Sequence, residues 1–252
     1  DILPTSTGRI LNVPTSDQTE VKGHRIAEGV KDVTKDMRFG RKQLGAYVYS
    51  SGIIKLSFEL LQDNGYGLEG KLPVTIGERI GRILNEELTT GTGTDMPEGV
   101  LAASGVGPTS TAAAAVTRAD LINLIHSINR AYRVGSKVRF MFNDTTLAAI
   151  KKLSIGSSDD RPLWSAGMVT GAPDRLEGFQ YIINNDMPDL ATGNKAILFG
   201  DFSKYTIRQV KTNTILRLNE KYADERVVGF YGFARYDGKL LDTKAIKHLQ
   251  QA

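Results

Sequence analysis

One stretch, residues 24–62, constrains the fold of this chain more than any other, because it has the pattern of strands but little to bury at its centre. After a short first run at 25–33, apolar residues alternate with others at 44–48 and 54–58, which is the period of a half-buried strand. The segment KDVTKDMRFGRKQ, at 31–43, is densely charged. This predicts a long hairpin with a polar tip in solvent. Because a two-stranded ribbon is only marginally stable alone, we expect another chain to support it.

The composition is that of an ordinary globular protein and excludes several kinds of chemistry. The chain has 252 residues, which allows one large domain or two small ones. It contains no cysteine, which excludes thiol catalysis and Cys-ligated metal sites. The net charge of +4 is too small to indicate nucleic-acid binding alone. Without a long apolar run we expect no membrane partner, and from the first residue, Asp1, we expect a processed, truncated or partly represented chain.

A strong helical signal lies at residues 73–90. Pro73 suits a first helical turn and Gly91 stands where a helix would end. Gly77 and Gly81, four residues apart, are either weak helix positions or a place where another backbone approaches closely. The apolar residues that recur at helical spacing are Ile76, Ile80, Ile83, Leu84 and Leu88.

The segment TTGTGTDMPEGVL, residues 89–101, is rich in glycine and hydroxyl side chains, as phosphate-binding loops are. It lacks the lysine of a Walker A motif, and it follows a helix, whose C-terminal dipole has the wrong sign for an anion. We therefore interpret it as a turn in which Gly91 ends the helix and Pro97 and Gly99 redirect the chain. Small residues dominate 102–116, which predicts a flexible linker.

The second half of the chain mixes helical segments with short strands from distant parts of the sequence, which predicts an α+β fold. No catalytic or metal-binding pattern stands out there. His24, His126 and His248 lie in separate segments without a partner at ligand spacing. The acidic pair in the long polar loop at 154–175 is typical of a solvated surface. We expect no enzyme activity, no metal and no cofactor.

A basic cluster with one aromatic side chain lies at the expected tip of the hairpin. It can be a solvated face that keeps the tip soluble, or a contact with acidic groups of another subunit. Nucleic acid is a third interpretation, although the cluster offers a single aromatic residue for stacking. We take the subunit contact as the working hypothesis. The residues are Lys35, Arg38, Phe39, Arg41 and Lys42.

Two motifs flank the expected helix, SFELLQD at 57–63 and GTGTDMPEGVL at 91–101. Three further segments follow: VRFMFNDTTLAAIKKL, AILFGDFSKYTIRQV and ARYDGKLLDTKAIKHL. In this order they resemble the tailed-bacteriophage major capsid proteins of the Hong Kong 97-type fold. In that family the first motif leads into a long spine helix and the second forms the loop after it. The resemblance extends over about residues 23–249.

The resemblance implies a Hong Kong 97-type α+β fold with four parts. An N-terminal arm precedes the E-loop, an extended hairpin that lies over a neighbouring subunit in the family. The spine helix belongs to a peripheral (P) domain, and an axial (A) domain meets its copies around the capsomer axes. The implied ranges are 1–23 for the arm, 24–52 for the E-loop, 53–116 and 205–236 for the P domain, and 117–204 and 237–252 for the A domain. The spine helix and its exit turn would contain Ile80, Leu84, Gly91, Pro97 and Gly99.

The function implied by the resemblance is that of a major capsid protein, assembled in the host cytoplasm and located in the virion. Hexamers and pentamers of the chain would form an icosahedral shell around double-stranded DNA, bound without sequence specificity. Decoration, scaffold and portal proteins are further candidate partners. Alternatives are an encapsulin-like compartment and a soluble enzyme with an unrecognised site.

Two features depart from the family pattern. The scaffolding segment that many relatives cleave from the N-terminus during procapsid maturation has no counterpart in this sequence. The Asn and Glu residues of the family's covalent cross-link also find no match, so the resemblance does not imply a cross-link. Lys31, Lys35 and Lys42 still leave a lysine donor available.

Overall fold

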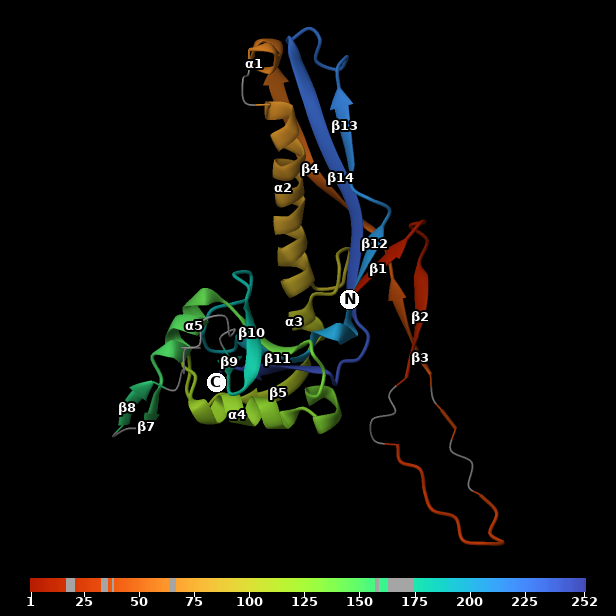
Figure 1. The fold of residues 1–252 in the computed structure, drawn as a ribbon, viewed down its shortest axis with the longest axis vertical. Coiled ribbons are helices and arrows are strands. Elements are labelled where there is room, and N and C mark those ends of the chain that lie inside the picture. The colour runs from red at the N-terminus through yellow and green to blue at the C-terminus, as the bar shows by residue number, and fades with distance from the viewer. Residues whose placement is uncertain (17–20, 33–35, 38, 64–66, 157–158, 163–174) are drawn as a thin grey trace.

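The computed structural model describes residues 1–16, 21–32, 36–37, 39–63, 67–156, 159–162 and 175–252. The chain forms an elongated unit, a compact unit at its foot, and an extended loop that hangs away from both (Figure 1). The fold mixes helices with several sheets built from distant segments, so the predicted α+β class is confirmed.

The elongated unit is a twisted sheet with one long helix, α2 (Leu68–Thr90), packed along it (Figure 1). The central strand, β14, pairs antiparallel with β4 along one side and with β12 and β13 along the other. The N-terminal strand β1 pairs parallel with β12 and so belongs to the same sheet. The bounds are β1 (Ile2–Thr5), β4 (Tyr47–Ser57), β12 (Tyr205–Val210), β13 (Thr214–Leu218) and β14 (Val227–Leu240).

Helix α2 packs on the sheet through the apolar stripe that the sequence predicts. Ile76 and Ile80 are each 2% exposed and lie in one core with Val228 and Phe230 of β14. The helix begins at Leu68, earlier than the predicted residue 73, because Leu72 also packs against the sheet. Pro73 therefore lies inside the helix on its exposed side and not in the first turn. A short helix, α1 (Phe58–Gln62), precedes it and is capped by the hydroxyl of Ser57, which accepts from the amide of Leu60.

The compact unit is a second sheet whose strands run in the order β5-β15-β11-β6-β10-β9 within the described residues. Helices α4 and α5 pack on one face of this sheet around Phe140, Phe142 and Phe199. Its elements are β5 (Gly105–Thr109), α4 (Arg118–Ser127), η1 (Arg130–Arg133), β6 (Val138–Phe142), α5 (Asp144–Lys151), β9 (Arg175–Leu176), β10 (Phe179–Ile183), β11 (Lys195–Asp201) and β15 (Ile246–Gln250). A separate pair, β7 (Ser154–Gly156) and β8 (Asp159–Pro162), follows α5.

The prediction of a flexible linker at 102–116 is wrong for residues 105–109, which form strand β5 beside β15. A side chain at Gly107 would place its Cβ 2.3 Å from the carbonyl oxygen of His248. Small residues occur here because the strand is tightly packed. Strand β14 of the elongated unit continues to Leu240 before the chain enters β15 of the compact unit, so the expected boundary at residue 236 falls inside a strand.

The two units meet through a third apolar core at the foot of α2. It joins Leu198 and Ile246 of the compact sheet to Tyr205 and Leu240 of the elongated sheet. The short helix α3 (Val100–Ala103) lies between them, followed along the chain by β5, and η2 (Phe202–Lys204) leads from β11 into β12. This core fixes the lower end of the elongated sheet in Figure 1 against the compact unit.

The exit turn of α2, residues 91–99, folds back on the helix end through close backbone contacts. The amide of Gly91 donates to Glu87 O at 2.8 Å, and the amide of Gly99 donates to Gly91 O at 2.8 Å. A Cβ at Gly91 would lie 2.4 Å from Pro97 O, and one at Gly99 would lie 2.6 Å from Thr89 O. Glycine is required at both positions because the backbones leave no room for a side chain.

Alanine substitutions at glycines of α2 and of its exit turn should have opposite effects on stability. Gly99→Ala forces a Cβ into backbone atoms and should lower the free energy of unfolding by about 1–3 kcal/mol. Gly77→Ala is the matched control, because no described atom lies within 4 Å of its Cβ position and alanine favours a helix by about 1 kcal/mol. Denaturant unfolding of both variants tests this, and equal stability of Gly99→Ala and the wild type would contradict it.

The buried histidine of β15 makes stability depend on pH. His248 is 1% exposed and its Nδ1 lies 2.8 Å from Ser104 Oγ. Burial, aided by the nearby Lys195, lowers the pKa of His248 to about 4. The unfolded chain therefore takes up this proton first, and stability should fall as the pH drops from ~6.5 towards 4, by up to ~3 kcal/mol.

Unfolding midpoints at pH 7 and pH 5 check this expectation. A His248→Gln variant should lose this part of the pH dependence, even if its stability at pH 7 is lower. The same pH dependence in the variant and in the wild type would show that another group is responsible.

Candidate functional site

The extended loop leaves the body on a short ribbon of two strands. Strand β2 (Leu11–Thr15) pairs antiparallel with β3 (Gly40–Leu44), so that Val13 lies opposite Lys42. The described loop residues between 16 and 39 extend beyond this ribbon, well away from both units (Figure 1). The arm and the loop base therefore form one structure, whereas the sequence predicted a hairpin closed within residues 24–62.

Apolar side chains on the extended loop are exposed to solvent. The loop has a turn at 27–30, where the amide of Val30 donates to Ala27 O at 3.2 Å. The apolar residues that stand in solvent near this turn and along the returning segment are Val21, Ile26, Val30, Met37 and Phe39, with 43–67% of each exposed. Their concentration on one projecting segment marks a surface for contact with another molecule.

Two residues of the predicted basic tip, Arg41 and Lys42, are not at the tip of the loop. Arg41 and Lys42 lie in β3, at the base, because this segment pairs with arm residues that the sequence left without a strand. Phe39 is exposed beside them, whereas Lys35 and Arg38 lie outside the described residues. Of the described residues of this set, Arg41 and Lys42 therefore belong to the base of the loop and not to its end.

Arg41 and Lys42 point into different surroundings. Arg41 is exposed, opposite Pro14 of the arm. Lys42 turns towards the body, where its Nζ donates to Leu240 O at 2.5 Å. Burial lowers the pKa of Lys42, although Glu98 nearby acts in the opposite direction. Arg41 remains available to a partner, and Lys42 helps to seat the loop.

A buried arginine that the sequence analysis missed anchors the arm and the loop. Arg208 of β12 is 2% exposed. Its Nη1 donates to Leu44 O at 2.9 Å and to Gly45 O at 2.8 Å, just where the loop joins the elongated unit. Its Nη2 donates to Thr7 O at 2.7 Å and its Nε to Thr5 Oγ1 at 3.1 Å, both in the arm. The available signal was a lone arginine in the alternating strand YTIRQV.

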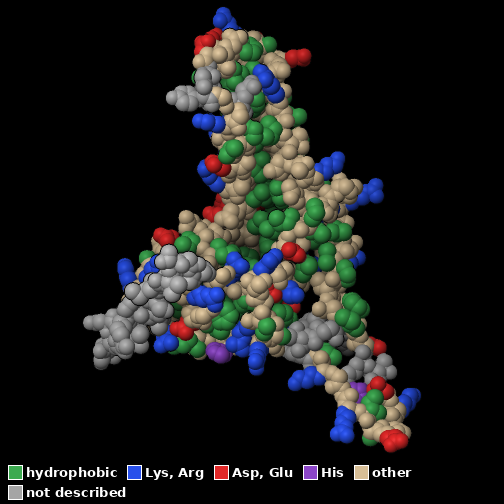
Figure 2. All heavy atoms as spheres, in the orientation of Figure 1, with side chains coloured by type: hydrophobic (Ala, Val, Ile, Leu, Met, Phe, Trp, Pro, Cys, Tyr) green, Lys and Arg blue, Asp and Glu red, His purple; other side chains and the backbone are tan. Residues whose placement is uncertain are grey.

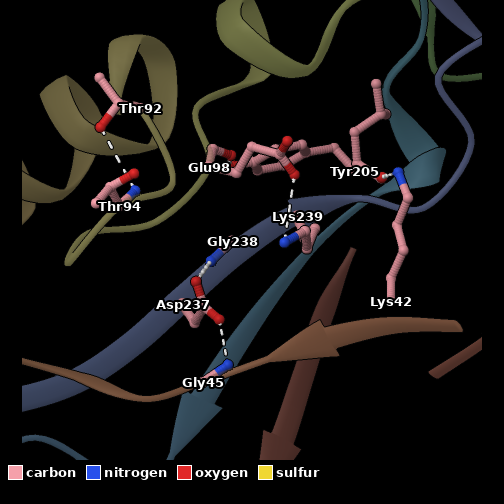
Figure 3. A network of polar contacts seen from close by, with 10 residues as sticks. Lys42, Gly45, Thr92, Thr94, Glu98, Tyr205, Asp237, Gly238 and Lys239 are labelled. Carbon is pink, nitrogen blue, oxygen red and sulfur yellow. Dashed lines mark hydrogen bonds and ion pairs between the residues drawn. The ribbon is translucent and has the colours of Figure 1, made fainter. Parts of the chain in front are cut away.

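An aspartate holds the same short segment from the central strand. Asp237 of β14 is 5% exposed, and its carboxylate accepts from the amides of Gly45 and Gly238 (Figure 3). Burial raises the pKa of Asp237, and these amide hydrogen bonds oppose the rise. Arg208 and Asp237 together bind both hydrogen-bonding groups of the Gly45 backbone.

The other predicted site residues have structural positions. Ile80 is buried and Leu84 half-buried on α2, both packed towards the sheet. Gly91, Pro97 and Gly99 form the exit turn described above: the amide of Gly91 donates to Glu87 O at the helix end, the amide of Gly99 donates to Gly91 O, and Pro97 O accepts from the amide of Gly93. These residues shape the backbone, as the sequence indicates.

Away from the loop, the described surface contains an apolar recess. A recess of about 360 Å³ lies where the foot of α2 meets the compact sheet, and it is lined largely by apolar side chains such as Leu88, Met141 and Phe202. Among the described residues there is no group of three His, Asp or Glu that could hold a metal, and no helix long and apolar enough to cross a membrane. Figure 2 shows Lys and Arg side chains scattered over both units and the loop on this face, not gathered in one patch.

Comparison with known proteins agrees with this picture of a structural protein. No curated protein matches the chain. The solved structure "Capsid of native GTA particle computed with C5 symmetry" matches with a TM-score of 0.84 and 25% identity, over 100% of this chain and 87% of that chain. The corresponding empty-particle capsid gives 0.85 and 26%, with the same coverage.

A more distant structure shows the same fold. The chain from Mycobacterium phage Adephagia matches with a TM-score of 0.71 and 13% identity, over 99% of this chain and 87% of that chain. A model of the phage capsid family covers residues 2–251, almost the whole sequence. The chain therefore belongs to the phage capsid family, and it is a major capsid protein of the Hong Kong 97-type fold that forms a head shell.

Proposed function

We propose that the shell is built from hexamers and pentamers of this chain, in which the loop and arm of each copy lie on a neighbouring copy. The elongated unit takes the part of the P domain and the compact unit that of the A domain around the capsomer axis. Likeness to capsids of GTA particles, solved with C5 symmetry, supports rings of identical copies. Residues 105–109 and 246–250 go with the A domain in this assignment, because they share its sheet.

The observation that carries the proposal is the projecting loop. Its exposed apolar side chains have little of their own chain within reach, and each buried Å² of apolar surface stabilises a contact by roughly 25 cal/mol. Obligate interfaces between subunits commonly bury 2,000–5,000 Å² or more, which extended segments supply readily. Much of the stability of the loop then belongs to the assembly and not to the single chain.

The shell encloses double-stranded DNA in this proposal, held without sequence specificity. The net charge of +4 and the scattered basic side chains fit a surface that tolerates DNA without reading it. Assembly takes place in the host cytoplasm, with scaffold, portal and decoration proteins as further partners, and the chain has no catalytic role. No covalent cross-link between copies is part of the proposal.

Two basic residues of the predicted cluster, Arg38 and Arg41, should contribute to assembly. Replacing Arg38 and Arg41 by glutamate reverses charge at the contact and should weaken shell formation about tenfold or more, equivalent to ~1.4 kcal/mol per contact. The Arg38→Lys and Arg41→Lys double variant is the matched control, because it keeps the charge. Negative-stain microscopy and sedimentation of the purified protein measure shells, and circular dichroism verifies the fold.

Two results would contradict these expectations separately. Normal shells from the glutamate variant would show that the basic residues are only a solvated face. A wild-type protein that stays a compact monomer under all assembly conditions would overturn the proposed function itself, in favour of a soluble protein of another class.

The contents of particles from producing cells test the DNA proposal. We expect nuclease-resistant double-stranded DNA inside, because a closed shell excludes the enzyme. DNA recovered without preference for a sequence motif supports enclosure without readout. Shells that contain a cargo protein and no DNA would point instead to an encapsulin-like compartment.

A further inference from the structure

We propose that Arg208 and Asp237 are positioning residues, which fix the direction in which the extended loop leaves the body and tie that direction to the exit turn of α2. The inference rests on the proposed role of the loop in contacts between copies. It starts from the two-residue segment Leu44–Gly45, where β3 ends and the chain enters the elongated unit.

The backbone of this segment is bound from two sides by charged side chains. Arg208 donates to the carbonyls of Leu44 and Gly45, and Asp237 accepts from the amide of Gly45. Leu44 itself is fully buried. Hydrogen bonds have preferred directions, so these contacts fix the orientation of the peptide groups as well as their place. A rotation of the loop about its base would break them together.

The charge of Arg208 and Asp237 indicates a role other than stability, because apolar side chains often stabilise a buried site as well as charged ones do. Removing an arginine and an aspartate from water is expensive, and well-packed apolar residues of similar size often stabilise a fold as well as buried charged groups do. What the two charged side chains add is geometry, since the guanidinium presents several donors in a rigid plane. Arg208 and Asp237 therefore favour one orientation of the loop base over others that bury the same area.

The arm shares the same anchor. Arg208 also holds Thr5, at the end of β1, and Thr7, between β1 and β2, and β2 is the strand that pairs with β3. One guanidinium therefore contacts both the arm and the loop base, in addition to the pairing of β1 with β12. The segment that would reach the neighbouring copy therefore includes both strands of the ribbon, β2 and β3, as well as the loop.

The residues after Asp237 attach to the exit turn of α2 (Figure 3). Glu98 donates its amide to Gly238 O at 3.2 Å, and its carboxylate lies 3.6 Å from Lys239 Nζ. Gly238 has no room for a side chain, because its Cβ would lie 2.3 Å from Leu88 Cδ2 of α2. Two residues after Gly238, the carbonyl of Leu240 accepts from Lys42 of the loop base. A short segment of β14 therefore contacts the loop base and the helix exit in turn, so a displacement of one shifts the other.

Native-state hydrogen exchange of the full-length protein tests the proposal. In Arg208→Lys, which keeps the charge but loses the planar fork, the amides of β2 other than at Pro14 and the amides at 40–44 should exchange at least tenfold faster, with the global unfolding midpoint nearly unchanged. Asp237→Asn, which lacks one of the two acceptor oxygens, should give the same result and also raise exchange at Glu98. Arg217→Lys on β13, whose Nε bonds to Asn219 at 2.9 Å far from the loop, is the matched control.

A change in the exit turn of α2 should also affect the loop base. Gly99→Ala disturbs the exit turn without touching the loop, and it should raise exchange at 40–44 by more than its loss of global stability accounts for, whereas Gly77→Ala on the same helix should not raise it. Wild-type exchange at 40–44 in Arg208→Lys and Asp237→Asn would overturn the proposal. So would a rise that only follows global unfolding, because that result indicates a merely structural role.

Shell formation separates this inference from the proposed function. Where the wild type assembles, Arg208→Lys should give fewer or irregular shells, although both of its units remain folded. Exchange is measured before assembly, so it tests the clamp even if the wild type forms no shell, a result that would count against the proposed function alone.

Discussion

The close packing of α2 on the central strand β14 is the contact on which the rest of the structure depends. It requires glycine where the helix meets the strand: a Cβ at Gly232 would lie 2.2 Å from Ile76 Cγ2, and one at Gly238 would lie 2.3 Å from Leu88 Cδ2. Between these points Ile80 is buried against the sheet. Because every other strand of the elongated sheet pairs with β14 or with its neighbour β12, the helix and this strand set the frame to which the loop, the arm and the compact unit are attached.

The two units bury their own apolar side chains, whereas the extended loop leaves its apolar side chains exposed. The cores around Ile80 and around Phe140 are closed, whereas Val30, Met37 and Phe39 stand in solvent on a segment that projects from the body. A monomeric protein would gain nothing from such a segment, which is expensive to order and easily cleaved. For a shell subunit it is useful, because identical copies repeat the same contact around a ring.

The sequence predicts the parts of this fold whose causes are local. The spacing of Ile76 and Ile80 identifies α2, and the helix dipole already argues against an anion at Gly91 and Gly99. Sequence patterns fail to predict an element whose structure is set by a segment that is distant along the chain. The loop tip was misplaced because the strand that pairs with residues 40–44 lies at 11–15, in a segment without periodicity of its own.

The other failures follow the same logic. Small residues at 105–109 were taken for a linker because sequence alone cannot distinguish a flexible glycine from one pressed against a neighbouring strand. The anchor was missed because an arginine in a strand is usually a surface residue, and nothing local to Arg208 indicates that Thr7 and Gly45 lie within its reach. The motifs that carry the family resemblance, such as SFELLQD, are recognisable because each is one contiguous segment. The groups that position the loop are spread over the chain.

This distribution has a physical reason. The direction of a projecting loop cannot be set from within the loop, since a two-stranded ribbon bends easily at its base. It must be set by groups of the body that are rigid themselves, and Arg208 and Asp237 meet this requirement because each lies on a strand paired on both sides. The residues that touch a neighbour can then vary with the neighbour, whereas the residues that aim the loop are fixed by the internal geometry of the sheet.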